Sequence, residues 1–442
     1  MQPRALSFDQ TVWLTVILLF IVIGAVIARG DQRLLQVIRM SPAPESTGTS
    51  TRVQIDIQFD QRLAPPSGAV QLSFTPALTG QLQIAVDRLL FMPATPLQSH
   101  TTYTATLTAG LRGAQSGSLQ EALTWHFTTG GVQIAYTAID GEGQERLFLT
   151  DAQLKDGSNS PAQPIQITSG PLRLWDYSVS PTSGAIVYSA LKADGTSDLW
   201  QFAPGDSMAQ LLVPCPNAVC NSTAWSPDGK LLAYARRNGG DFGAAAFSPP
   251  RLWLFEPATG ETVPLFPDSQ KLAFEPSWST DGQWLSYVAP DTGGVGVVNL
   301  QSGADTLYAT ASGETGRWHP QENRLLYSLL HQIGEQYVSH LLLVDPVLGT
   351  TVNVSGEDAL VEDTAPSWSP DGQWIALRRK ELTGSGATPG KQLWRIRADG
   401  SAAQPLTADP AYDHSQPLWS PDGRYLLYHK LPLKGPEVTL SV

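Results

Sequence analysis

The sequence is poor in cysteine and in charge, and it lacks the common signatures of catalysis. Only two of its 442 residues are cysteine, and only 15% are charged. The formal net charge of −12 excludes the basic surface that nucleic-acid binding requires. Neither a Gly-x-Ser-x-Gly elbow nor a His-Glu-x-x-His helix motif occurs. We therefore predict no catalytic residue, no metal site, no cofactor and no nucleic-acid partner.

One long apolar run is present at residues 12–28, VWLTVILLFIVIGAVIA. As a helix it would span roughly 26 Å, close to the hydrocarbon thickness of a bilayer. We predict that it is a transmembrane signal anchor behind a short tail, residues 1–11. A cleaved signal peptide is the alternative, because Val26-Ile27-Ala28 has a form that signal peptidase accepts. The predicted location is the cell membrane, single-pass, with the C-terminal domains extracytoplasmic, although the flanking arginines favour the opposite orientation.

A small β-sandwich is predicted at residues 52–129, after a linker at residues 29–51 that is rich in Ser, Pro and Thr. Apolar and polar residues alternate through 53–59, and about seven such short segments follow one another, the number that an immunoglobulin-like fold needs. The order of Leu89-Leu-Phe-Met-Pro93 and Trp125-His-Phe-Thr-Thr129 resembles that of bacterial Ig-like domains from cell-surface proteins.

A repeated phrase organises the rest of the chain, residues 130–442. Trp368-Ser-Pro-Asp-Gly372 returns in closely similar form at three other places, and two degenerate copies complete the series. The lead residues are Val179, Trp225, Trp278, Trp318, Trp368 and Trp419, spaced 40 to 53 residues apart. Ser-Pro-Asp-Gly is a tight turn, and a short apolar strand follows each copy. This period, with short strands throughout, predicts a β-propeller.

These repeats resemble the propeller of TolB and its relatives, a family that includes envelope scaffold proteins and the propeller halves of certain peptidases. The predicted fold is all-β: a transmembrane helix, an Ig-like sandwich, and a propeller of six or seven blades. Seven is favoured, because the aliphatic-Tyr strand phrase occurs seven times.

The predicted function is binding rather than catalysis. We expect a membrane-anchored extracytoplasmic scaffold whose propeller binds a protein or a cell-envelope component. A propeller hydrolase or lyase with a site in the central funnel is the alternative. The expected binding face is the one with long second and fourth connections, such as 331–337, 355–366 and 407–416, because irregular loops on a rigid scaffold commonly bind. Its candidate acids are Glu357, Asp358, Glu362, Asp363, Asp409 and Asp413. A merely solvated acidic rim is the competing interpretation.

The two cysteines, Cys215 and Cys220, are separated by four intervening residues in one predicted loop. A disulfide ring is the favoured interpretation and would suit an oxidising exterior. Free thiols are the alternative, whereas metal binding would need further ligands.

Overall fold

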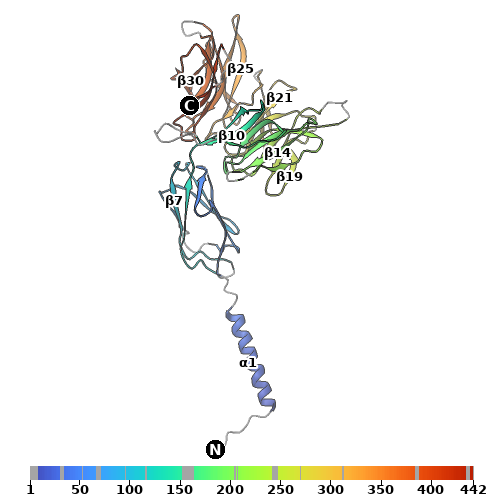
Figure 1. Ribbon diagram of the computed structural model, residues 1–442, viewed down its shortest axis with the longest axis vertical. Helices are drawn as coiled ribbons and strands as arrows, with labels where there is room; N and C mark the ends of the chain where they lie inside the picture. The colour runs from blue at the N-terminus through green and yellow to red at the C-terminus, as the bar shows by residue number, and fades with distance from the viewer. Residues whose placement is uncertain are drawn as a thin grey trace, which may run out of the picture. The chain divides into compact units, whose positions relative to one another are not determined.

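The computed structural model forms one helix and then strands, in two compact units that are described separately (Figure 1). The first unit contains residues 1–49 and 53–129, and the second contains residues 50–52 and 130–442. The structure describes residues 8–434 and 439–441, except 30–33, 52, 66–70, 95, 115–116, 152–163, 204–205, 207, 241–246, 269, 311–312 and 384–387.

The helix α1 comprises Phe8–Arg29 and contains the apolar run. Several of its large side chains are exposed, among them Leu18 at 62% and Phe20 at 70%. Among the residues that the structure describes, no helix combines the length and apolarity needed to cross a membrane. The transmembrane anchor therefore stays a prediction.

The first unit has two four-stranded sheets. One has the order β1 (Val37–Ser41), β3 (Ile55–Phe59), β6 (Arg88–Pro93), β5 (Gly80–Ile84); the other has β2 (Ser46–Thr49), β8 (Leu123–Thr129), β7 (Thr102–Leu107), β4 (Leu72–Thr75). Alternate side chains of these strands enter one core, which includes Ile55, Ile57, Tyr103, Trp125 and Phe127. The alternation seen in the sequence is therefore the packing pattern of a half-buried strand.

The predicted linker at residues 29–51 is wrong for its second half. Strand β1 pairs with β3, with Met40 opposite Ile57, and β2 runs parallel to β8. Leu35, which precedes β1, is 3% exposed and belongs to the core. The Ser, Pro and Thr content indicated a linker, but tertiary packing recruits this segment into both sheets.

The second unit is a succession of antiparallel sheets. The first is three-stranded, with β9 (Gln133–Ile139), β10 (Glu145–Asp151) and β11 (Ile165–Gln166). Three four-stranded sheets follow: β12 (Arg173–Val179), β13 (Ile186–Leu191), β14 (Ser197–Phe202), β15 (Gln210–Val213); β16 (Ala218–Trp225), β17 (Leu232–Asn238), β18 (Arg251–Glu256), β19 (Glu261–Pro264); and β20 (Phe274–Trp278), β21 (Trp284–Ala289), β22 (Gly294–Asn299), β23 (Asp305–Ala309).

Two further four-stranded groups are joined by one parallel bridge, Ser339 to Glu362. They are β24 (Arg317–Trp318), β25 (Leu325–Ile333), β26 (Gln336–Asp345), β27 (Thr350–Asn353), and β28 (Val361–Trp368), β29 (Trp374–Glu381), β30 (Gln392–Arg397), β31 (Gln404–Pro405). The last sheet has β32 (Tyr412–Trp419), β33 (Leu426–Pro432) and β34 (Thr439–Ser441). From β12 onward, the first strand of each group contacts the first strand of the next, so these are the inner strands. The preference for seven blades over six stays a prediction.

The repeated turn is held by its own serine and aspartate. The Ser226 hydroxyl donates to Asp228 Oδ1 at 2.7 Å and accepts from the Leu231 amide at 2.9 Å. Gly229 has φ +70°, the left-handed conformation that a Cβ disfavours. The same two hydroxyl bonds recur at Ser279, Ser369 and Ser420. The repeated Ser, Asp and Gly therefore serve to hold the conformation of the turn.

The repeat tryptophans join neighbouring sheets. Each of four indole Nε1–H groups donates to a backbone carbonyl of the preceding inner strand: Trp278 to Ala224 at 3.0 Å, and Trp318 to Ser277, Trp368 to Arg317 and Trp419 to Ser367 at 3.1 Å each. These bonds satisfy the buried indole N–H groups and set the spacing between sheets.

Four inner strands carry a bulge at the same place, and β12 carries one a single residue earlier. Pairing shifts register between residues 221 and 224, likewise at 274/277, 364/367 and 415/418, and at 174/177 in β12. Ser222, Glu275, Ala365 and Gln416 have φ near +50° at this bulge.

The bulges explain why parts of the predicted irregular loops are strands. The loop predicted at 355–366 contains the start of β28 at Val361, and that at 407–416 contains the start of β32 at Tyr412. A bulge breaks the alternation that reveals a strand in a sequence. The loop predicted at 331–337 is instead a hairpin, because β25 ends at Ile333 and β26 begins at Gln336.

Candidate functional site

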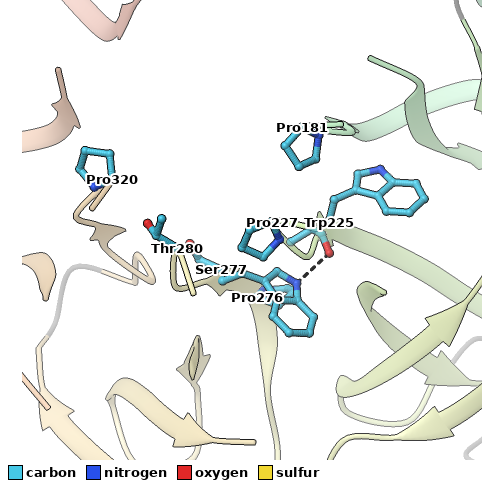
Figure 2. Close-up of a pocket in the computed structure, with 9 residues that line it drawn as sticks. Pro181, Trp225, Pro227, Pro276, Ser277, Thr280 and Pro320 are labelled. Atoms are coloured by element: carbon cyan, nitrogen blue, oxygen red, sulfur yellow. Dashed lines mark hydrogen bonds between the residues drawn. The ribbon is translucent and has the colours of Figure 1, made fainter. Parts of the chain in front are cut away.

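A pocket of about 380 Å³ lies among the inner strands and repeat turns of four successive sheets (Figure 2). Its lining comes from β16 and β20 and from the turns that follow β12, β16, β20 and β24: Pro181, Ala224, Trp225, Pro227, Pro276, Ser277, Trp278, Thr280 and Pro320. Four prolines and two indoles make this lining largely apolar and rigid. Ser277 and Thr280 add polar groups.

Trp225 differs from the other repeat tryptophans. Its buried Nε1–H has no acceptor among the described residues, whereas the indole of Trp278 in the same pocket donates to the Ala224 carbonyl (Figure 2). A buried donor without a partner is costly and uncommon, and it needs an explanation.

Carboxylates occupy the bulges of two inner strands, β12 and β20, which lie on either side of β16. Asp176, at the β12 bulge, accepts a hydrogen bond from the amide of Ser222 on β16, while its other oxygen is buried without a partner among the described residues. Burial raises the pKa of Asp176 to about 6; the bond from Ser222 opposes this effect, and the charge of Glu275 adds to it. The pKa of Glu275, whose side chain is exposed, is also raised, by partial desolvation and by repulsion from Glu314, while Arg317 opposes the shift. The inner strands therefore hold interacting negative charges.

The predicted binding-face acids are dispersed and mostly paired. Glu357 and Asp358 are exposed. Glu362 pairs with Lys391 at 3.3 Å, Asp409 with Lys430 at 3.2 Å, and Asp413 with Arg378 at 2.6 Å. The structure thus brings four of the six acids into ion pairs with cations of β29, β30 and β33 or their ends, rather than leaving one free acidic surface.

Asp363 is a structural residue rather than a rim acid. Its side chain is 1% exposed and receives two bonds from Arg379, Nε to Oδ1 at 2.7 Å and Nη2 to Oδ2 at 2.6 Å. It lies on β28 directly opposite Arg379 on β29. The prediction failed here because the bulge at residues 364–367 hid the strand.

Cys215 and Cys220 are joined by a disulfide between the end of β15 and the start of β16. Both residues are fully buried. The Cys220 carbonyl accepts bonds from the hydroxyls of Ser189 and Ser197, and the Cys215 amide donates to Asp198. The ring is therefore built into the packing between two sheets.

Across the described part of the chain, no three His, Cys, Asp or Glu side chains are grouped as metal ligands. In the sequence, residues such as Trp225 and Pro227 are recognisable only as members of the repeat, and the pocket they line was not predicted. Nor were Asp176 and Glu275 predicted. Their signal was positional: both lie three residues before a lead residue, where other copies have Ser222, Ala365 and Gln416.

The bacterial Ig-like domain family matches residues 31–129. This segment is a bacterial Ig-like domain. The match begins before β1 and ends with β8, so the family boundary agrees with both sheets of the first unit.

The second unit resembles known β-propeller proteins. TolB from Acinetobacter baumannii is 13% identical, with 79% of this chain and 82% of that chain covered and a TM-score of 0.40. The propeller domain of the Trilobed protease from Pyrococcus furiosus is 15% identical, with 61% and 80% covered and a TM-score of 0.44. These similarities concern the fold and say nothing of activity.

A curated relative is the uncharacterized peptidase YuxL of Bacillus subtilis, which is 26% identical over 207 residues. The matched part is 46% of this chain but only 28% of that protein. The chain thus spans under a third of the length of this relative.

Proposed function

We propose that the second unit binds an extended polypeptide segment at the inner-strand pocket, as the substrate-binding part of a peptidase-like protein. The observation that carries the proposal is the rigid pocket of proline and tryptophan among the inner strands. The similarity to a protein named as a peptidase supports the choice of ligand.

The pocket chemistry suits a peptide in two ways. An apolar side chain would contact the rings of Pro227, Pro276 and Trp278, and burial of apolar surface would favour binding. The Trp225 indole would add aromatic contact area at the same place. Asp176 and Glu275 would favour segments that carry lysine or arginine, because the carboxylates attract cations.

The test is binding of a blocked peptide library to the full chain, followed by calorimetry with the best member. Trp225→Ala removes an indole that lines the pocket, so it should weaken binding by about tenfold. Trp419→Ala is the matched control, because Trp419 is the lead residue of another repeat and does not line the pocket. Equal affinities for wild type and Trp225→Ala would refute the proposal.

A second candidate is catalysis by the chain itself, as a hydrolase or lyase with a site at the inner strands. The similarity to YuxL favours this candidate over a pure scaffold. Mass spectrometry of the same library after incubation separates the two: binding without cleavage supports the first, whereas cleavage that Asp176→Asn abolishes assigns the second.

Membrane attachment through residues 12–28, with both units outside the cytoplasm and an envelope protein as partner, is a further part of the proposal. Its support is the exposed apolar surface of α1, which includes Leu18 and Phe20. Protease treatment of intact cells should digest a membrane-bound second unit. Protection of that unit in spheroplasts would contradict the orientation.

A further inference from the structure

Strand β5, Gly80–Ile84, is a free edge of the first unit. Within the described residues it pairs only with β6. Gly80, Gln81, Gln83 and Ile84 are exposed, and Leu82 is partly buried against the core. The outer edge of such a strand presents unpaired backbone donors and acceptors that can pair with another strand.

The hydrogen bonds at the two ends of the hairpin determine which groups are free. The Ala85 amide donates to the Arg88 carbonyl at 2.9 Å, and the Ala94 amide donates to the Thr79 carbonyl at 2.8 Å. Bonding alternates along an antiparallel pair, so residues 79, 81, 83 and 85 bond toward β6. The N–H and C=O groups of Gly80, Leu82 and Ile84 therefore point outward.

This edge lacks the usual protection against pairing. Residues 79–86, TGQLQIAV, contain no charge and no proline. The other three edges of the sandwich are interrupted: β1 contains Arg39, β2 follows Glu45, and β4 is followed by Pro76. Charged residues and prolines are the common devices that stop edge-to-edge association. Their absence at β5 alone marks this edge as an interaction surface.

We propose that β5 pairs antiparallel with β5 of a second copy of this chain, across a two-fold axis at Leu82. Gln81-Leu82-Gln83 reads the same in both directions, so this register places Leu82 opposite Leu82 and Gln81 opposite Gln83. Gly80 then lies opposite Ile84. The residues that face across the axis in bonded pairs are 80, 82 and 84, whose backbone groups are the free ones.

Self-pairing is favoured over pairing with an unrelated strand by symmetry and by charge. An isologous contact needs a surface complementary to itself, and this uncharged strand, palindromic over residues 81–83, brings no like charges together. It would also cover Ile84, whose side chain is 38% exposed in the single chain. The sheet that contains β5 in one copy and the same sheet in the second copy would then form one continuous sheet of eight strands.

The test is sedimentation equilibrium of the full chain in mild detergent, over a concentration series. Gln81→Lys with Gln83→Lys places lysines opposite lysines at both side-chain pairs and should weaken dimerisation by about tenfold. Gln81→Lys with Gln83→Glu places lysine opposite glutamate and should restore the wild-type association constant. Both positions are exposed, so equal melting temperatures serve as the folding control.

A wild-type chain that is monomeric throughout the series would overturn the proposal. So would a dimer with the same association constant in both double variants, because its interface would lie elsewhere. Loss of association in the first variant and its return in the second support pairing at β5.

Discussion

The contact between Gly372 and His319 gives the sharpest prediction on stability. His319 stands where other copies of the turn have serine, and its ring reaches the next repeat turn, with Nε2 at 3.1 Å from the Gly372 carbonyl. Its Nδ1 accepts the amides of Gln321 and Glu322, so the neutral ring donates from Nε2. A Cβ added at Gly372 would lie 2.4 Å from His319 Cε1 and Nε2.

The magnitude of Gly372→Ala has two parts. A left-handed residue with a Cβ costs about 1–2 kcal/mol, because φ is +70°. Displacing His319 also breaks its bond to the carbonyl, which adds about 1 kcal/mol, and disturbs its edge contact with Trp368 at 4.7 Å between centroids. We therefore expect a loss of about 2–4 kcal/mol in the free energy of unfolding.

Gly423→Ala is the matched control. The turn and the φ of +71° are the same, but there the Cβ meets only Pro370 Cδ, at an ordinary 3.6 Å. It should cost about 1–2 kcal/mol. Urea unfolding followed by tryptophan fluorescence at about pH 8, where histidine is neutral, measures both variants. Adding His319→Ser should make Gly372→Ala less costly by removing the collision. Equal costs at positions 372 and 423, or strict additivity with His319→Ser, would refute the argument.

Three further predictions concern charge and redox state. Because the pKa of Asp176 is raised from 3.8 to about 6, its contribution to stability is full below pH 3.8 and is lost as pH rises through 6. Asp176→Asn should therefore raise the free energy of unfolding at neutral pH by on the order of 1–3 kcal/mol and change it little below pH 3.8. Urea titrations at several pH values measure this effect, and an effect that does not depend on pH would contradict the argument. Asp363→Ala should lower the free energy of unfolding by about 3–5 kcal/mol, because it leaves Arg379 buried without its partner. The exposed pair Glu357→Ser with Asp358→Ser should leave the melting temperature almost unchanged. Similar melting temperatures for the single and the double variant would count against the burial argument. Cys215 and Cys220 should resist alkylation in protein from its native compartment until it is reduced and unfolded, and rapid labelling of both without reductant would show that the disulfide is absent there.

The repeat and the turn chemistry carried most of what the sequence could predict. Ser-Pro-Asp-Gly encodes its own hydrogen bonds locally, so the turns at Gly229 and Gly372 follow from the residues alone. The Ig-like domain was also recognisable from its order of strands, but its first two strands were not. Strands β1 and β2 depend on partners far along the chain, namely β3 and β8, and local composition says nothing of those partners.

The binding face was harder to predict, because it depends on residues whose roles the repeat conceals. Strand bulges look like loops in a sequence, and this placed Glu362, Asp363 and Asp413 on loops when all three lie on strands. The cations that pair with these acids are distant in the sequence: Lys391, Arg379 and Arg378. The local sequence around each acid therefore does not indicate that its charge is neutralised.

Within each repeat some residues hold the structure and others vary from copy to copy, and this explains where binding specificity can arise. The lead Trp residues from Trp278 onward and the Ser, Asp and Gly of the turn make recurring bonds in successive sheets, so changing them costs stability. The bulge residue, three positions earlier, is held in place by this frame but makes no bond that all copies share. It varies from Asp176 to Ser222, Glu275, Ala365 and Gln416. A buried Asp176 with a raised pKa is unfavourable for folding, and a position that is free to vary has no structural reason to keep such a group. The inner-strand bulges beside the Trp225 pocket are therefore where selection for binding can act without dismantling the sheets.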